Sequence, residues 1–332
     1  MTAPAVSVVI PTRDRRALLA RALGTVLRQE ATAVEVIVVD EASEDDTPRW
    51  LAALRDPRIV VVRHDVAKGV AEARNAGIER ASAPWVAFVD DDDLWAPWKL
   101  ASQLEALARE ESSAWAIGSA AVVDGRLRIR AAQRIAALDR FLPLLLGHNV
   151  VPGGASGVVA NTEAVRRAGG FDSRLRIMAD WDLWIRLALE SPPAAVDRPV
   201  VAYVLHGANM TSEPAGFRRE LEYIREKHRG ARAALGVELN DRGWSEWLAE
   251  VQRRSGLRLA PALIQARIAV SHRQPRSAAR ALAVAFSPGW LDRRDAWRIQ
   301  RIPAAWREEA EAWLEPIRQA GPSGGDGLPP RA

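Results

Sequence analysis

Short apolar runs alternate with longer amphipathic segments through the first hundred residues. Runs rich in β-branched residues predict strands, which lie at residues 6–10, 34–39, 59–62 and 85–89. Between them, residues 17–29, 47–54 and 70–81 repeat apolar side chains at helical spacing. Short, continuously apolar strands are typical of a sheet that is covered on both faces. The alternation predicts an α/β fold with a mostly parallel sheet and helices on both faces.

The pattern is less regular in the second half of the chain. We expect helices at 97–109, 161–168 and 180–189, and short strands near 120–129, 153–160 and 200–205. Beyond about residue 216 the chain becomes rich in arginine, alanine and leucine, and it ends in a Gly/Pro-rich segment. We therefore predict an α/β domain over 1–212, a helical C-terminal region over 213–318 and a disordered tail over 319–332.

Composition excludes several classes of site and partner. The chain has 332 residues, of which 48% are hydrophobic, so it can bury a sizeable core. It has no cysteine, which excludes disulfides, thiolate metal sites and cysteine nucleophiles. The N-terminal segment lacks the pattern of a secretory signal, and no apolar run is long enough to span a membrane. We expect a cytoplasmic protein.

Positive charge is concentrated near the C-terminus. Residues 253–307 contain twelve arginines and two aspartates, a formal charge of +10, whereas the whole chain carries only +4. One interpretation is a helical appendage with solvated arginines. The other is a basic surface that docks peripherally on the inner face of the cell membrane, where lipid-linked acceptors reside. Nucleic-acid binding is not expected, because no recognition motif accompanies the charge.

Polar side chains follow each of the four predicted N-terminal strands. In order along the chain they are Pro11-Thr12-Arg13-Asp14, Asp40-Glu41, His64-Asp65 and the four aspartates 90–93. The carboxyl ends of parallel strands meet at one edge of a sheet, which is where open α/β sheets bind ligands. Neither the dinucleotide fingerprint GxGxxG after the first strand nor the phosphate loop GxxxxGK[ST] is present. Any phosphate must therefore be held in another way.

Four consecutive aspartates repel one another unless a cation offsets their charge. Mg²⁺ and Mn²⁺ prefer oxygen ligands, so aspartates 90–93 predict a metal site that binds a diphosphate. The alternative is a turn with a helix N-cap, since aspartate is favoured in both. Other polar residues have similar alternatives. Asp40 either binds a base or ribose or caps the next turn, and His206 is either a ligand or a surface loop residue. Arg74 is either a ligand or a solvated charge, and Asp180 and Asp182 are either catalytic or N-capping.

Taken together, these motifs resemble the family 2 glycosyltransferases, which have the GT-A fold. The resemblance covers roughly residues 5–210. It is carried by the ordered segments VSVVIPTRDR, VEVIVVDEASEDDT, KGVAEARNAGI, WVAFVDDDDLWAPWKL, GGFDSRL and MADWDLWIRLA. It implies an inverting enzyme that transfers a sugar from a nucleotide-diphosphate donor to an acceptor hydroxyl.

The resemblance also implies roles for individual residues. Nucleotide-sugar contacts fall on the ends of the first, second and fourth strands and on the helix before the fourth strand. The residues are Pro11, Thr12, Arg13, Asp40, Arg74, Asp90 and Asp91. Metal binding by Mn²⁺ or Mg²⁺ falls on Asp92, with Asp91 as its rival and His206 as a further ligand. By its position, Asp180 is expected to be the general base, with Asp182 as the second candidate. Asp93 is expected to start the following helix.

Two positions depart from the family pattern. The usual glycine turn after the second strand is replaced by Glu41-Ala42-Ser43, and the Glu that commonly precedes the base is Ala179. We expect a UDP- or dTDP-sugar as donor. The acceptor would belong to a cell-surface glycan, a lipid-linked intermediate or a natural product, as in polysaccharide biosynthesis. The alternatives are a nucleotidyltransferase and a non-catalytic sugar-nucleotide binding protein.

Overall fold

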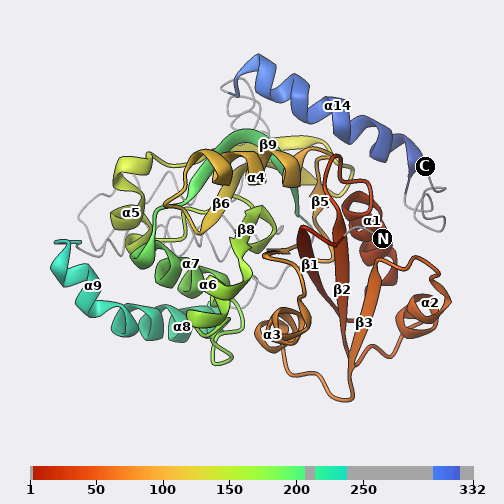
Figure 1. The fold of residues 1–332 in the computed structure, drawn as a ribbon, viewed down its shortest axis with the longest axis horizontal. Helices are drawn as coiled ribbons and strands as arrows, with labels where there is room; N and C mark the ends of the chain where they lie inside the picture. Colours follow the sequence, from red (N-terminus) through yellow and green to blue (C-terminus); the bar gives the residue numbers. More distant parts are fainter. Residues whose placement is uncertain (1–2, 206–213, 238–301, 322–332) are drawn as a thin grey trace, which may run out of the picture.

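A computed structural model describes residues 3–205, 214–237 and 302–321 of the chain. Within these residues the strands form one nine-stranded sheet in the order β3-β2-β1-β4-β8-β6-β9-β5, and β7 pairs with β6. Helices cover both faces of the sheet (Figure 1). The predicted α/β class, with helices on both sides, is therefore confirmed.

The first half of the sheet is parallel, as the alternating pattern predicts. β1 pairs in parallel with both β2 and β4, and β2 pairs in parallel with β3. The elements are β1 (Val6–Thr12), α1 (Arg16–Val26), β2 (Val34–Glu41), α2 (Thr47–Ala53), β3 (Ile59–His64), α3 (Val70–Arg80) and β4 (Trp85–Phe88). Their loops bring the residues that follow β1, β2 and β4 to one edge of the sheet.

The second half of the sheet is mixed. β8 runs antiparallel between β4 and β6, whereas β9 pairs in parallel with β6 and antiparallel with the short β5. The strands are β5 (Leu94–Trp95), β6 (Trp115–Asp124), β7 (Ile129–Gln133), β8 (Val158–Asn161) and β9 (Ala194–Leu205). The helices are α4 (Lys99–Arg109), η1 (Leu138–Arg140), α5 (Phe141–Gly147), η2 (Gly154–Gly157), α6 (Thr162–Arg167) and α7 (Ala179–Glu190).

Side chains of the central strands alternate between two hydrophobic cores. Val8 and Ile10 of β1 lie in the core beneath α1 and α4, whereas Val9 lies in the core beneath α3 and α7. This alternation with a period of two explains why apolar residues stand at successive positions of the strands instead of at every second one. The core on the α7 side holds a cluster of aromatic rings, in which Trp115 and Trp184 stack 5.9 Å apart.

Three further helices follow the sheet: α8 (Pro214–Lys227), α9 (Arg229–Ala234) and α14 (Ala304–Ala320). α8 lies beside α6 and α7 and α9 lies beside α5, while α14 crosses the opposite side of the molecule (Figure 1). Trp306, Trp313 and Leu314 of α14 pack into a third core with β5 and β9. Among the described helices, none combines the length and the apolar character needed to span a bilayer. The predicted disordered tail falls on residues that are mostly outside the described part of the chain.

Candidate active site

Three of the four consecutive aspartates turn toward one another at the end of β4. Asp90, Asp92 and Asp93 each offer a carboxylate oxygen, and these oxygens all lie within 4.8 Å of one another. Such a set of hard oxygen donors suits Mg²⁺ or Mn²⁺. The residues therefore fit the predicted divalent cation. Asp92, the predicted metal ligand, is a member of this group.

Asp91 lies outside that group and faces the end of β1. Its carboxylate accepts a hydrogen bond of 2.8 Å from Thr12 Oγ1 and one of 3.1 Å from Arg15 Nη1. Burial and the neighbouring charge of Asp92 raise the pKa of Asp91 to about 7, while Arg15 and Thr12 oppose the rise. Asp91 thus ties β1 to the end of β4, and Arg15 also reaches Asp92 at 3.1 Å.

Asp93 is the fully buried member of this group. Its carboxylate accepts hydrogen bonds from Ser156 Oγ at 2.6 Å and from the backbone N–H of Val204 at 3.1 Å. The prediction that Asp93 starts the next helix is wrong, because the two-residue strand β5 follows it and α4 begins only at Lys99. Asp93 instead joins three chain segments beneath the site, a role that local sequence does not reveal.

The second strand contributes a buried carboxylate to the same edge. Asp40 accepts a hydrogen bond of 2.9 Å from the Ser43 backbone N–H and pairs with Arg63 of β3. Ala42, in the turn between Asp40 and Ser43, has a φ of 55°, which lies in the left-handed region that favours glycine. The altered turn therefore keeps the conformation that a glycine there would adopt readily.

Of the residues predicted after β1, Pro11 and Thr12 are buried within the strand, whereas Arg13 is about half exposed. Arg13 pairs with its neighbour Asp14 at 3.5 Å. The arginine that reaches the aspartates is Arg15, which the sequence analysis missed. The only available signal was its place in the same loop, which does not distinguish it from Arg13.

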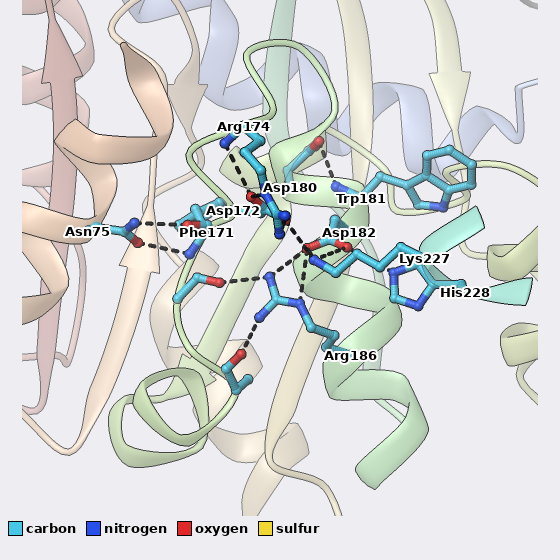
Figure 2. Close-up of polar contacts among 12 residues, drawn as sticks. Asn75, Phe171, Asp172, Arg174, Asp180, Trp181, Asp182, Arg186, Lys227 and His228 are labelled. Carbon is cyan, nitrogen blue, oxygen red and sulfur yellow. Dashed lines mark hydrogen bonds and ion pairs between the residues drawn. The ribbon is translucent and has the colours of Figure 1, made fainter. Parts of the chain in front are cut away.

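Arg74 of α3 is buried, with only 4% of its surface exposed. Its guanidinium pairs with Asp90 and lies 5.1 Å from the ring centroid of Phe171. The interpretation of Arg74 as a solvated surface charge is therefore wrong. The neighbouring Asn75 holds the backbone of Phe171 beside Arg74. Its side-chain amide donates a hydrogen bond to the Phe171 carbonyl and accepts one from the Phe171 N–H (Figure 2).

Asp180 lies in the first turn of α7 and is partly exposed. One carboxylate oxygen accepts a hydrogen bond of 2.7 Å from the Trp181 backbone N–H, and the other accepts one of 3.3 Å from Asn149 Nδ2. Burial raises the pKa of Asp180, Asp90 adds to the rise, and Arg74 and the two hydrogen bonds oppose it. Asp180 is thus close enough to Asp90 and Arg74 for their charges to shift its pKa. Asn149 is a further site residue that the sequence analysis missed.

Asp182, two residues further along α7, is enclosed by basic side chains (Figure 2). It pairs with Arg186 at 2.7 Å, Lys227 at 2.8 Å and His228 Nε2 at 2.8 Å. Burial disfavours its charge, but the hydrogen bond from His228 and the charges of Arg186 and Lys227 prevail and lower the pKa of Asp182 to about 2. A carboxylate held in this way is a poor proton acceptor. Neither Asp180 nor Asp182 is the N-cap of α7, which is Met178.

Tyr203 of β9 completes this part of the site. Burial and the charges of Asp93, Asp92 and Asp90 raise the pKa of its phenol, and Asp180 contributes as well. Its hydroxyl group therefore stays protonated among the carboxylates and can donate a hydrogen bond. His206, predicted as a further metal ligand, lies outside the described residues.

Comparison with known proteins finds similar sequences and folds. The model of the family described as glycosyl transferase family 2 matches residues 7–168. The chain is 28% identical over 276 residues to the putative colanic acid biosynthesis glycosyl transferase WcaA of Escherichia coli, covering 77% of this chain and 96% of the relative. It is 36% identical over 152 residues to the succinoglycan biosynthesis protein ExoO of Rhizobium meliloti, covering 45% of this chain and 43% of that protein.

Solved structures share the fold at low sequence identity. Residues 1–349 of TarS from S. aureus match 96% of this chain and 91% of that structure, with a TM-score of 0.55 and 16% identity. The mannosyltransferase PcManGT from Pyrobaculum calidifontis, solved with GDP-Man and Mn²⁺, matches 96% of this chain and 86% of that structure, with a TM-score of 0.50 and 20% identity. Identities at this level establish similarity of fold alone.

Proposed function

Because this chain belongs to the family 2 glycosyltransferases and has the GT-A fold, we propose that it is an inverting enzyme. We also propose that it depends on a divalent metal ion. It would move a sugar from a nucleotide-diphosphate donor to an acceptor hydroxyl. The carboxylates at the end of β4 form the donor side of the site. Asp180 at the start of α7 forms the acceptor side.

The observation that carries this proposal is the contrast between the two acids of α7. Asp182 is buried and held by Arg186, Lys227 and His228. Asp180 is instead partly exposed, and its pKa is raised by burial and by the nearby charge of Asp90. A general base must reach the substrate and prefer the proton more than an ordinary carboxylate does. Only Asp180 of this pair combines both properties.

The proposed reaction is a single displacement. Asp180 takes the proton of the acceptor hydroxyl while the hydroxyl oxygen forms a bond to the anomeric carbon. The bond from that carbon to the diphosphate oxygen breaks, and the nucleoside diphosphate leaves with the electron pair. Because the oxygen attacks from the face opposite the leaving group, the anomeric configuration inverts.

The chain's own groups would prepare the donor for this step. Asp40 would receive the base or ribose, and the loop after β1, through Thr12 and Arg13, would line the nucleotide together with Arg74. Asp92, with Asp90 and Asp93 beside it, would hold a divalent cation, which when bound neutralises charge on the diphosphate. Arg74 keeps Asp90 oriented toward this group through their ion pair.

The names of similar proteins support a nucleotide-sugar donor and a lipid-linked or polysaccharide acceptor. TarS structures are described with UDP and with UDP-GlcNAc, and WfaP of Escherichia coli is named as a UDP-Glc:alpha-D-GlcNAc-diphosphoundecaprenol glucosyltransferase. The chain spans only 42% of the length of WfaP, at 29% identity. We accordingly propose a UDP- or dTDP-sugar as donor and a hydroxyl of a surface polysaccharide precursor as acceptor, reached peripherally at the inner face of the membrane.

A product assay tests the reaction class. Purified protein is incubated with a panel of nucleotide sugars and Mn²⁺ or Mg²⁺, with water or simple glycosides as acceptors. We expect free nucleoside diphosphate, a released sugar or glycoside of inverted configuration by NMR, and loss of turnover when EDTA removes the metal. In a parallel reaction with nucleoside triphosphates and sugar phosphates in place of nucleotide sugars, release of pyrophosphate would instead identify a nucleotidyltransferase. Metal-dependent binding of the nucleotide sugar without turnover on any acceptor would identify a binding protein.

A further inference from the structure

Three consecutive backbone N–H groups just before α7 converge on one distant carboxylate. Glu220 of α8 accepts a hydrogen bond of 2.9 Å from the N–H of Arg176 on Oε1, and bonds of 2.9 Å from those of Ile177 and Met178 on Oε2. Glu220 is buried, with 9% of its surface exposed. These contacts lie beyond residue 168, where the match to the family model ends.

The turn that leads into α7 is held by this external acceptor, while the helix itself lacks a side-chain cap. The first N–H groups of a helix have no partner within the helix, and a Ser, Thr, Asp or Asn at the N-cap commonly supplies one. Here the N-cap is Met178, which makes no side-chain hydrogen bond to the helix. Ala179, which stands where the family commonly has Glu, has no polar side chain either. Glu220 does not accept from these helical N–H groups but from residues 176–178, which precede α7, and it fixes the turn into the helix with charge-assisted hydrogen bonds, which are stronger than neutral ones.

α8 itself is fastened to the same region by separate contacts. Tyr223 Oη donates to Asp172 Oδ2 at 2.9 Å, and Lys227 pairs with both Asp172 and Asp182. Asp172 precedes the turn at 176–178, and Asp182 follows it (Figure 2). The backbone that Glu220 holds is therefore bracketed on both sides by ion pairs to the same helix.

We propose that Glu220 is a positioning residue for Asp180. By fixing the turn at 176–178, it sets the first turn of α7 so that the Asp180 carboxylate stays against Asn149 and toward the aspartates that follow β4. Asp180 is only two residues beyond the last N–H that Glu220 holds, so relaxation of this turn moves the carboxylate directly. The inference rests on the proposed role of Asp180 as general base.

The test compares Glu220→Ala, Glu220→Gln and a matched control, Tyr223→Phe. The control removes a hydrogen bond between the same helix and Asp172 without touching residues 176–178. For each full-length variant, kcat and KM are measured for hydrolysis of UDP-glucose and UDP-GlcNAc with Mn²⁺, and the Kd for UDP is measured by calorimetry. Amide hydrogen exchange of residues 176–178 gives a readout that does not depend on activity.

We expect Glu220→Ala to lower kcat about 10- to 100-fold, the size of loss that a misplacement near 1 Å produces. The KM for the donor and the Kd for UDP should stay near the wild-type values, and exchange at 176–178 should accelerate roughly tenfold. Glu220→Gln, which keeps one accepting oxygen, should fall between Glu220→Ala and the wild type. Tyr223→Phe should leave kcat and the exchange at 176–178 almost unchanged.

Equal losses of kcat in Glu220→Ala and Tyr223→Phe would overturn the inference, because they would reflect only the docking of α8. Unchanged exchange at 176–178 in both Glu220 variants would also overturn it, even if neither donor turns over. Asp180→Asn, assayed in parallel, distinguishes an error in the proposed general base from an error in the proposed role of Glu220. If Asp180→Asn remains active, the proposed base is wrong; if it is inactive while Glu220→Ala retains full kcat, only the positioning role fails.

Discussion

Aspartates around the site differ in what surrounds them, and these surroundings decide what each carboxylate can do. Asp93 is buried against Ser156 and a backbone N–H, and Asp91 is turned to Thr12 and Arg15. Asp182 is held by Arg186, Lys227 and His228. Asp90 and Asp92 remain beside the space in which a donor diphosphate would lie in the proposed reaction. One residue type thus fills structural and chemical roles within a few ångströms.

Arg74 offers a direct test at the scale of a single residue. Arg74→Met removes a buried positive charge beside Asp90, and in the proposed site also a contact to the nucleotide. We expect the Kd for UDP, measured by calorimetry with Mn²⁺, to rise about 10- to 100-fold, as for the loss of one hydrogen bond to a charged group. Arg80→Met, an exposed arginine on the same helix, is the control and should bind UDP like the wild type. Unchanged affinity in Arg74→Met would remove Arg74 from the nucleotide site.

Residue-level roles were only partly predictable from the sequence. The aspartates at 90–93 and Asp180 stand out locally, so their convergence could be anticipated from strand ends and spacing. The difference between Asp180 and Asp182 could not, because Lys227 and His228, which enclose Asp182, lie about 45 residues away in the chain. Asn149 likewise contacts Asp180 from a segment without a recognisable motif.

At the scale of elements, the close approach of α3 to β1 places Arg74 at the end of the sheet. Gly77 of α3 faces β1, and a Cβ built there would lie 2.3 Å from Val9 Cγ1. A glycine in the middle of a helix usually weakens it. At this position it allows the contact, since Val9 is a fully buried core residue with no room to move.

Replacing two helical glycines should therefore give opposite results. Gly77→Ala should destabilise the fold by about 1 to 3 kcal/mol through overpacking. Gly24→Ala in α1 should stabilise it by about 0.5 to 1 kcal/mol, because a Cβ there meets only the flexible side chain of Arg28 at 3.6 Å. Urea unfolding measures both. A stabilising Gly77→Ala would contradict the packing of α3 on β1.

The junction of α7 with α8 and α9 predicts a pH-dependent stability. Asp182→Asn leaves Arg186, Lys227 and His228 without their shared carboxylate and should cost about 3 to 5 kcal/mol, as for a broken buried ion pair. The exposed pair of Asp46 with Arg16 is the control, and Asp46→Asn should cost less than about 1 kcal/mol.

The sign of the pH effect follows from the lowered pKa of Asp182, about 2 instead of 3.8. The stability that its charge supplies is complete above about pH 4 and is lost as the pH falls toward 2. The difference in unfolding free energy between the wild type and Asp182→Asn should therefore shrink over this interval. A difference that stays constant from pH 6 to pH 2 would show that Asp182 does not carry its charge in the folded protein.

At the scale of the whole molecule, the fold class and the parallel half of the sheet followed from the sequence. Apolar runs at regular spacing specify β1 to β4 and the helices between them. The antiparallel placement of β8 between β4 and β6 did not follow, because the pattern of a single strand contains no information about which neighbours it joins. Arg-rich residues 253–301 lie outside the described part of the chain, so the membrane interpretation remains a prediction.

Membrane docking by the Arg-rich region can be tested by sedimenting the full-length protein with anionic vesicles. If the basic region docks on lipid, the protein should sediment with vesicles containing phosphatidylserine at about 0.05 M salt and be released at about 0.5 M salt. Vesicles of phosphatidylcholine alone are the control and should bind little protein. Replacing Arg293 and Arg294 with serine should weaken the sedimentation. Equal sedimentation with both kinds of vesicle would favour the interpretation of solvated arginines.

The central claim is that Asp180 removes the acceptor proton in an inverting glycosyl transfer. The most direct measurement compares the kcat of Asp180→Asn with that of the wild type, using the nucleotide sugar that the donor panel identifies, together with the Kd for UDP. We predict a loss in kcat of about 100-fold or more, the usual contribution of a general base, with the Kd unchanged within about twofold. Full turnover by a folded Asp180→Asn variant would contradict the account.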